Sequence, residues 1–129
     1  MIYVVDTHAL VWSVEGNDRL SHFAKDALND PAAEIVVPTI VLVEIIYLYT
    51  KKRIKTNLMQ VTAQIAGAQN CVVYPLDEEV LNHIPTDLNI HDAILCATAL
   101  VFRDILGNEV KIITKDKEII NSGTVETLW

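Results

Sequence analysis

The chain has 129 residues, of which 51% are hydrophobic and 21% charged, with four Gly and four Pro. This composition excludes disordered, collagen-like and low-complexity proteins, and the length predicts one domain over residues 1–129 with a proper core. Seventeen acidic against ten basic residues give a formal charge of −7, which argues against nucleic-acid binding unless several carboxylates bind cations.

The sequence carries neither a membrane span nor a secretion signal that we can recognise. The most apolar stretch, Ile35–Tyr49, is interrupted by Pro38 and Glu44, so no run of about 18 uncharged apolar residues occurs. The N-terminal apolar run contains Asp6 and has no Lys or Arg before it, unlike a secretory signal. We therefore expect a cytoplasmic protein.

Strand-like and helix-like segments alternate along the chain. The first half predicts strand 2–5, helix 7–14, a helix to residue 28 capped by Ser21, strand 34–37, a helix of three turns that Thr39 would cap, and helix 57–68. The second half predicts strand 71–74, helix 77–82, helix 91–103, strand 111–114, a helical turn 116–120 and a short fifth strand within 125–128. Strands separated by helices imply right-handed crossovers, so we predict an α/β fold in which helices cover both faces of a parallel sheet of four to five strands.

Four acidic residues occupy positions where such a sheet would place a site. Asp6 directly follows the first predicted strand, and Asp116 follows the fourth by two residues. Asp92 lies in the first turn of helix 91–103, and Glu44 lies within the apolar helical segment VLVEIIYLY. Because the carboxyl ends of parallel strands meet at one edge of a sheet, we expect these carboxylates to converge there.

Each acid also has a purely structural explanation. Asp6 and Asp116 are suitable N-caps for the helices that follow them, and Asp92 can interact with a helix N-terminus. Glu44 differs, because an ionised carboxylate among apolar side chains is costly to bury without a cation or hydrogen-bond partners, although it can also face solvent. The functional hypothesis therefore depends on the four acids together.

Short motifs follow one another in a fixed order: VVDTHALVW, DRLS, EIVVPTIVLVEI, HDAILCATAL, IITKD and the closing VETLW. The series resembles the PIN-domain ribonucleases, and most closely the VapC-type toxins of toxin–antitoxin pairs, over essentially the whole chain. The resemblance implies a three-layer α/β/α fold and an Mg²⁺- or Mn²⁺-dependent endoribonuclease that cuts single-stranded or looped RNA. It also implies a homodimer that a small antitoxin neutralises. The family's acidic set falls on Asp6, Glu44, Asp92 and Asp116.

The chemistry of the acidic set suits a divalent metal. Hard cations take oxygen ligands, and Mg²⁺ keeps several waters while it uses one or two carboxylates directly. Such an ion would activate a water for attack on a phosphodiester and neutralise charge on the phosphorane. We predict Asp6 and Asp92 as direct ligands, with Glu44 and Asp116 binding a second ion or holding water.

Two further groups of residues are candidates for supporting roles. Thr7 and Thr114 can support the acids through hydroxyl hydrogen bonds, whereas His8 and His91 are more simply explained as packing or capping residues. The candidate phosphate contacts are basic residues, namely Lys51, Lys52, Arg53, Lys55, Lys111, Lys115 and Lys117. An ordinary solvated helix end is the alternative for the run from Lys51 to Lys55.

Two other functions remain open at this point. The first is an RNA-processing PIN nuclease, or a degenerate PIN domain, with no toxin role. The second is a receiver-like domain in which Asp6 accepts a phosphoryl group and Lys115 follows a late strand. Trp12 and Trp129 receive no role from the sequence.

Overall fold

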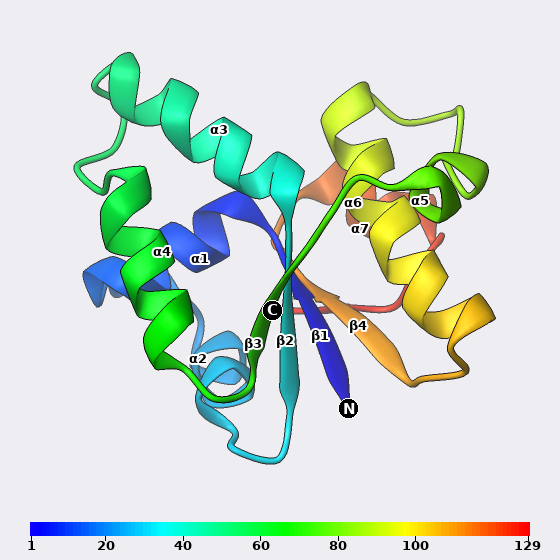
Figure 1. Cartoon of the computed structure of the whole chain (residues 1–129), viewed down its shortest axis with the longest axis horizontal. Coiled ribbons are helices and arrows are strands. Elements are labelled where there is room, and N and C mark those ends of the chain that lie inside the picture. The colour runs from blue at the N-terminus through cyan, green and yellow to red at the C-terminus, as the bar shows by residue number, and fades with distance from the viewer.

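A computed structural model describes all residues 1–129, which build one five-stranded sheet (Figure 1). The strands are β1 (Ile2–Val5), β2 (Glu34–Pro38), β3 (Cys71–Tyr74), β4 (Val110–Ile113) and β5 (Thr127–Leu128). They pair in the order β3-β2-β1-β4-β5, and every pair is parallel. The predicted parallel sheet is therefore confirmed, with β1 at its centre.

Helices cover both faces of the sheet and complete three layers. They are α1 (Thr7–Glu15), α2 (His22–Asn29), α3 (Thr39–Thr50), α4 (Leu58–Gly67), α5 (Glu78–Asn82), α6 (Ile90–Leu100) and α7 (Lys117–Ser122). In Figure 1 the sheet is seen nearly edge-on, with α1 to α4 on its left and α5 to α7 on its right. This arrangement confirms the predicted α/β/α architecture.

The core lies on both faces of β1 and β4. Val4, Val5, Ile112 and Ile113 are completely buried, as expected for central parallel strands that are covered on each side. Helix α6 is buried from Ala93 to Ala99. Its small side chains let it lie close to the sheet.

Most helix boundaries agree with the prediction to within two residues, and two differences have a tertiary cause. Thr39 is the first residue of α3 and not its cap, because the extended Pro38 (φ −62°, ψ 140°) precedes the helix and the Thr39 hydroxyl accepts a hydrogen bond from the Leu76 N–H at 3.2 Å. Helix α6 ends at Leu100, and a π-helical turn, Val101–Ile105, replaces its last turn. There the Leu106 N–H donates to the Val101 carbonyl, five residues back, at 3.2 Å.

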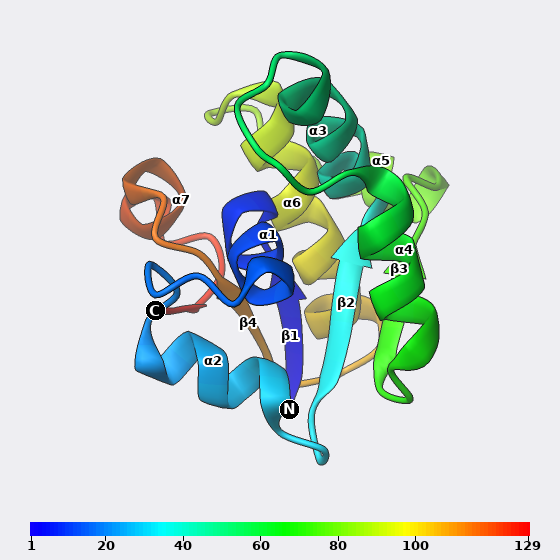
Figure 2. The ribbon, with the colours of Figure 1, turned by 90° about the vertical axis from the view of Figure 1, so that its left-hand side faces the viewer.

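The strand direction determines where the loops gather. Figure 2 shows β2 pointing toward the end of the molecule at which α1, α3, α6 and α7 begin. The residues that follow β1, β2 and β4 therefore share this edge of the sheet. None of the helices is long and apolar enough to cross a membrane.

Candidate functional site

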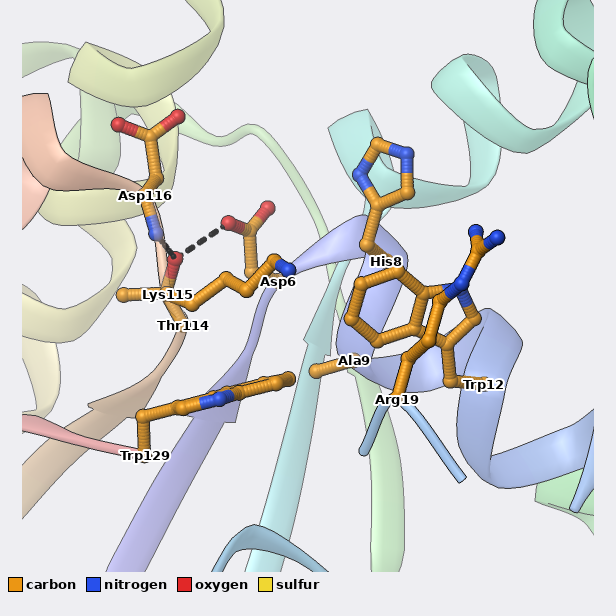
Figure 3. A pocket seen from close by; sticks show the side chains of 9 residues that line it. All are labelled: Asp6, His8, Ala9, Trp12, Arg19, Thr114, Lys115, Asp116 and Trp129. Atoms are coloured by element: carbon orange, nitrogen blue, oxygen red, sulfur yellow. Dashed lines mark hydrogen bonds between the residues drawn. The ribbon is translucent and has the colours of Figure 1, made fainter. Parts of the chain in front are cut away.

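The Thr114 hydroxyl joins two of the acids at the carboxyl edge. It follows β4 and donates a hydrogen bond of 2.6 Å to Asp6 Oδ2, while it accepts one of 3.0 Å from the Asp116 N–H. Figure 3 shows both bonds. Because β1 and β4 are neighbours in the sheet, Asp6 and Asp116 meet although 110 positions separate them in the sequence.

Asp6 is both a helix cap and a buried carboxylate. Its Oδ1 accepts a hydrogen bond of 2.7 Å from the Thr7 N–H, so it is the N-cap of α1. Burial raises its pKa, and the charge of Asp116 raises it further, against the hydrogen bonds from Thr114 and the Thr7 N–H. The capping and functional explanations of Asp6 are therefore compatible.

Asp92 lies in the first turn of α6, held by the cap residue Asn89. The Asp92 N–H donates to Asn89 Oδ1 at 3.0 Å, and Asn89 Nδ2 donates to Asp92 Oδ2 at 2.7 Å. Burial raises the pKa of Asp92, and the charges of Asp116 and Asp6 add to this. Asp92 is thus electrostatically coupled to both acids that follow strands.

Glu44 reaches the same acids from α3. Burial raises its pKa, as does the charge of Asp6, and His91 opposes the rise. The neighbouring Val43 and Ile46 are 42% and 43% exposed, so the apolar side of this segment faces solvent in part while Glu44 is half-buried. The buried Thr7 Oγ1 makes no hydrogen bond, although it is near enough to Glu44 to oppose the rise in that pKa.

Asp116 also has a capping role, at the start of α7. Its Oδ1 accepts hydrogen bonds from the Glu118 N–H at 2.8 Å and the Ile119 N–H at 3.3 Å. Like Asp6, it combines local capping with a place among the acids. All four predicted acids are therefore brought to one region of the molecule.

None of these four carboxylates is neutralised by a cationic side chain. The ion pairs of the chain join His22 to Asp26, Arg103 to Asp104 and Lys111 to Glu126. No three acidic, histidine or cysteine side chains stand close enough together to hold one ion at once. The oxygen donors nevertheless fit Mg²⁺ or Mn²⁺, because such an ion needs only one or two carboxylates and keeps water in its other positions.

Cys96 lies one helical turn after Asp92 and is buried. Burial, together with the charges of Asp92 and Asp6, raises the pKa of its thiol to about 12. A neutral buried thiol is neither a nucleophile nor a metal ligand. Cys96 therefore belongs to the packing beneath the acids.

A cavity of about 380 Å³ opens beside Asp6 and Asp116. Its lining residues come from both ends of the chain and are Asp6, His8, Ala9, Trp12, Arg19, Thr114, Lys115, Asp116 and Trp129. The sequence pointed to Lys115 but not to Arg19, Trp12 or Trp129 in this role. The one sequence signal for a role of Trp12 at this cavity is its position close after Asp6. Nothing in the sequence relates residue 129 to residue 12.

The basic run divides into two parts in the structure. Arg53 and Lys55 line a second cavity, of about 580 Å³. Lys51 and Lys52 are exposed after α3 and line neither cavity. The left-handed conformation of Lys52 (φ 59°) turns the chain at this point, which separates the two pairs.

The raised pKa values predict that the stability of the metal-free protein depends on pH. The folded pKa of Asp92 lies above its ordinary value of 3.8, so its contribution to stability is fully present below that value and is lost as the pH rises through the folded pKa. Asp92→Asn removes this dependence. In EDTA, we expect the urea concentration at the unfolding midpoint of the variant to increase relative to that of the wild-type protein as the pH rises. Midpoints that differ by a constant amount at all pH values would contradict the coupling of Asp92 to its neighbours.

Comparisons with known proteins identify a family. Residues 3–122 match the family model of the PIN domain. No curated protein matches the sequence.

Several solved structures share the fold at low sequence identity. VapBC2 from Rickettsia felis, bound to a DNA fragment from its promoter, matches with a TM-score of 0.66 and 12% identity over 99% of this chain and 98% of that one. VapBC-1 from nontypeable Haemophilus influenzae matches with a TM-score of 0.64 and 16% identity over 99% of this chain and 97% of that one. The RRP44 PIN domain from T. brucei matches with a TM-score of 0.59 and 15% identity over 98% of this chain and 75% of that one.

Proposed function

Because this chain belongs to the PIN-domain family, we propose that it is an Mg²⁺- or Mn²⁺-dependent endoribonuclease whose site is the set Asp6, Glu44, Asp92 and Asp116. One observation carries this proposal. The four carboxylates gather at the carboxyl edge of the sheet without a cationic partner, and burial and mutual repulsion raise the pKa of three of them. A bound divalent cation would relieve both costs.

The proposed roles of the four acids differ because their surroundings differ. Asp6 and Asp92 are the proposed direct ligands, since hydrogen bonds orient both carboxylates and burial and neighbouring acids raise the pKa of each. Glu44 and Asp116 flank them and would hold a second ion or orient the attacking water. When bound, the metal supplies charge neutralisation at the phosphate and lowers the pKa of a water. Lys115, beside the site, is placed to contact a phosphate oxygen.

The direct test is cleavage of a mixed pool of single-stranded RNA by the purified protein. We expect fragments in Mg²⁺ or Mn²⁺ and intact RNA in EDTA, with activity restored when metal is added back. Cleavage that persists in EDTA would contradict a metal-dependent site. An inert protein that is folded and free of any inhibitory partner would contradict the nuclease proposal itself.

Thr114 offers a more selective test, because it touches both Asp6 and Asp116. Thr114→Val keeps the side-chain shape but removes the hydroxyl that orients the two acids. We expect cleavage to slow by about 10- to 100-fold, as for other residues that orient metal ligands, while Thr114→Ser remains near the wild-type rate. Equal rates for the valine and serine variants would show that the hydroxyl has no positioning role.

We further propose that the protein is the toxin of a toxin–antitoxin pair, acts as a homodimer in the cytoplasm and is inhibited by a cognate antitoxin protein. The fold neighbours VapBC2 and VapBC-1 support this hypothesis. Expression in a bacterial host should then arrest growth, and co-expression of a small neighbouring gene should relieve the arrest. Normal growth with confirmed nuclease activity would favour an RNA-processing role.

The receiver-like alternative has less support. Lys115 lines the same cavity as Asp6, but it forms no ion pair with that carboxylate. Membership of the PIN family also favours phosphodiester hydrolysis over phosphoryl transfer to Asp6.

A further inference from the structure

Both tryptophans of the chain border the cavity beside the acids. Their ring centroids lie 5.9 Å apart at an interplanar angle of 63°. Trp12 is only 7% exposed and forms a wall, whereas Trp129 is half-buried and presents an indole face. Figure 3 shows the Trp129 ring lying along one side of the cavity, across from Asp6. At about 30 Å³ per water, this space would hold roughly a dozen waters, which is room for a nucleobase and its ribose.

Two cationic side chains lie at the same cavity without an acidic partner. Lys115 Nζ is 4.8 Å and Arg19 Cζ is 5.9 Å from the centroid of Trp12. Neither takes part in an ion pair. Their long side chains can move from the indole to a phosphate with little strain, because cation–π contacts at such sites are weak.

A second, more basic cavity lies next to the first. The two cavities share His8, Trp12 and Arg19, and the second also contains Arg53 and Lys55. The segment that carries these two residues is anchored to the end of α1, where the Thr56 hydroxyl donates a hydrogen bond of 2.8 Å to Glu15. A strand of nucleic acid in these cavities would therefore run from the acids, past the tryptophans, to a cationic end.

We propose that the cavity bordered by Trp12 and Trp129 binds one unpaired nucleobase, stacked on the indole of Trp129. The base belongs to the RNA strand that is cut at the acids, and Lys115 and Arg19 contact the adjacent phosphates. This inference rests on the proposed nuclease function and assigns to it a surface that holds one base of the bound strand. Aromatic side chains stack on any exposed base, whereas a base in a duplex is already stacked and paired. Because Asp6 and Asp116 line the same cavity, the bound base lies next to the phosphate at the acids.

The test measures RNA binding separately from cleavage. The Asp92→Asn protein, which preserves the substrate, is titrated in Mg²⁺ with a fluorescein-labelled single-stranded RNA of about 12 nucleotides, within the usual site size for such proteins. Both tryptophans lie at this cavity, so tryptophan fluorescence, followed in a second titration with the unlabelled RNA, reports on this site, and we expect it to be quenched. Adding Trp129→Ala should weaken binding about tenfold, and Trp129→Phe should restore most of the affinity.

Matched controls separate stacking from general effects. Phe23→Ala removes an exposed aromatic side chain from α2, away from the cavity, and should leave the affinity unchanged. Lys115→Ala should weaken binding and reduce the salt dependence by about one phosphate contact. A blunt RNA duplex should bind equally to the proteins with and without Trp129→Ala.

Two results would overturn the inference. One is saturable binding of the single strand with no change in tryptophan fluorescence, which needs no variant. The other is unchanged affinity in a Trp129→Ala protein that melts normally. If the wild-type protein cleaves RNA in either case, the nuclease proposal stands and only the base-binding cavity is rejected. Trp129-dependent binding without any cleavage in Mg²⁺ or Mn²⁺ would instead reject the nuclease and retain the binding site.

Discussion

Asp92→Asn is expected to slow metal-dependent RNA cleavage by about a thousandfold, because metal coordination contributes several kcal/mol to the transition state and each 1.36 kcal/mol is a factor of ten. The substitution keeps the size of the side chain and its place beside Asn89 but removes the charge that attracts the cation. Single-turnover rates in saturating Mn²⁺ measure the effect. Asp6→Asn should cause a loss of similar size.

Asp26→Asn is the matched control for these variants. Asp26 lies on α2 and pairs only with His22, and both side chains are largely exposed. Its loss changes the net charge by the same amount as Asp92→Asn but leaves the carboxyl edge of the sheet intact. A rate for Asp92→Asn within tenfold of the Asp26→Asn rate would remove Asp92 from the proposed metal ligands.

Saturating Mn²⁺ is expected to raise the melting temperature of the wild-type protein by about 10 °C. A ligand at 100 times its Kd stabilises the folded state by about 2.7 kcal/mol, and for a domain of this length 1 kcal/mol corresponds to about 4 °C. The physical reason is the relief of repulsion among Asp6, Glu44 and Asp92, whose pKa values are raised by burial and by neighbouring acids. Thermal unfolding in EDTA and in Mn²⁺ tests this without any substrate.

The variants give this measurement an internal control. Asp6→Asn combined with Asp92→Asn should lose most of the shift, whereas Asp26→Asn should retain it. In EDTA near neutral pH, Asp92→Asn should melt at or above the wild-type temperature, since one repelled charge is gone. A melting temperature that does not respond to Mn²⁺ or Mg²⁺ in the wild-type protein would argue against a metal bound at these acids.

Local signals account for most of the fold. Hydrophobic periodicity and cap residues such as Ser21 and Asp116 predict the helices and strands to within a few residues. The two boundary errors have tertiary causes. The Thr39 hydroxyl accepts a hydrogen bond from the Leu76 N–H, and the last turn of helix 91–103 widens into a π-turn. Neither interaction is visible in the short segment from which a boundary is predicted.

The candidate acids could be selected from sequence because their positions follow from strand direction. Residues just after parallel strands must reach one edge of the sheet, so the sequence predicts Asp6 and Asp116 there, whereas their contact through Thr114 belongs to the folded structure. The sequence does not predict the electrostatic consequence. The raised pKa values depend on how deeply each carboxylate is buried and which charges face it, and both are properties of the packed structure.

The sequence by itself determined the order of elements, the parallel sheet and the acidic edge, because propensity, periodicity and capping act over a few residues. Only the tertiary structure decided which distant side chains share a surface. The pairing of β4 with β5 brings Trp129 to Trp12, and the left-handed turn at Lys52 places Arg53 and Lys55, but not Lys51, in the cavity next to them. Such contacts depend on strand order and on single backbone conformations, which no local pattern in the chain specifies.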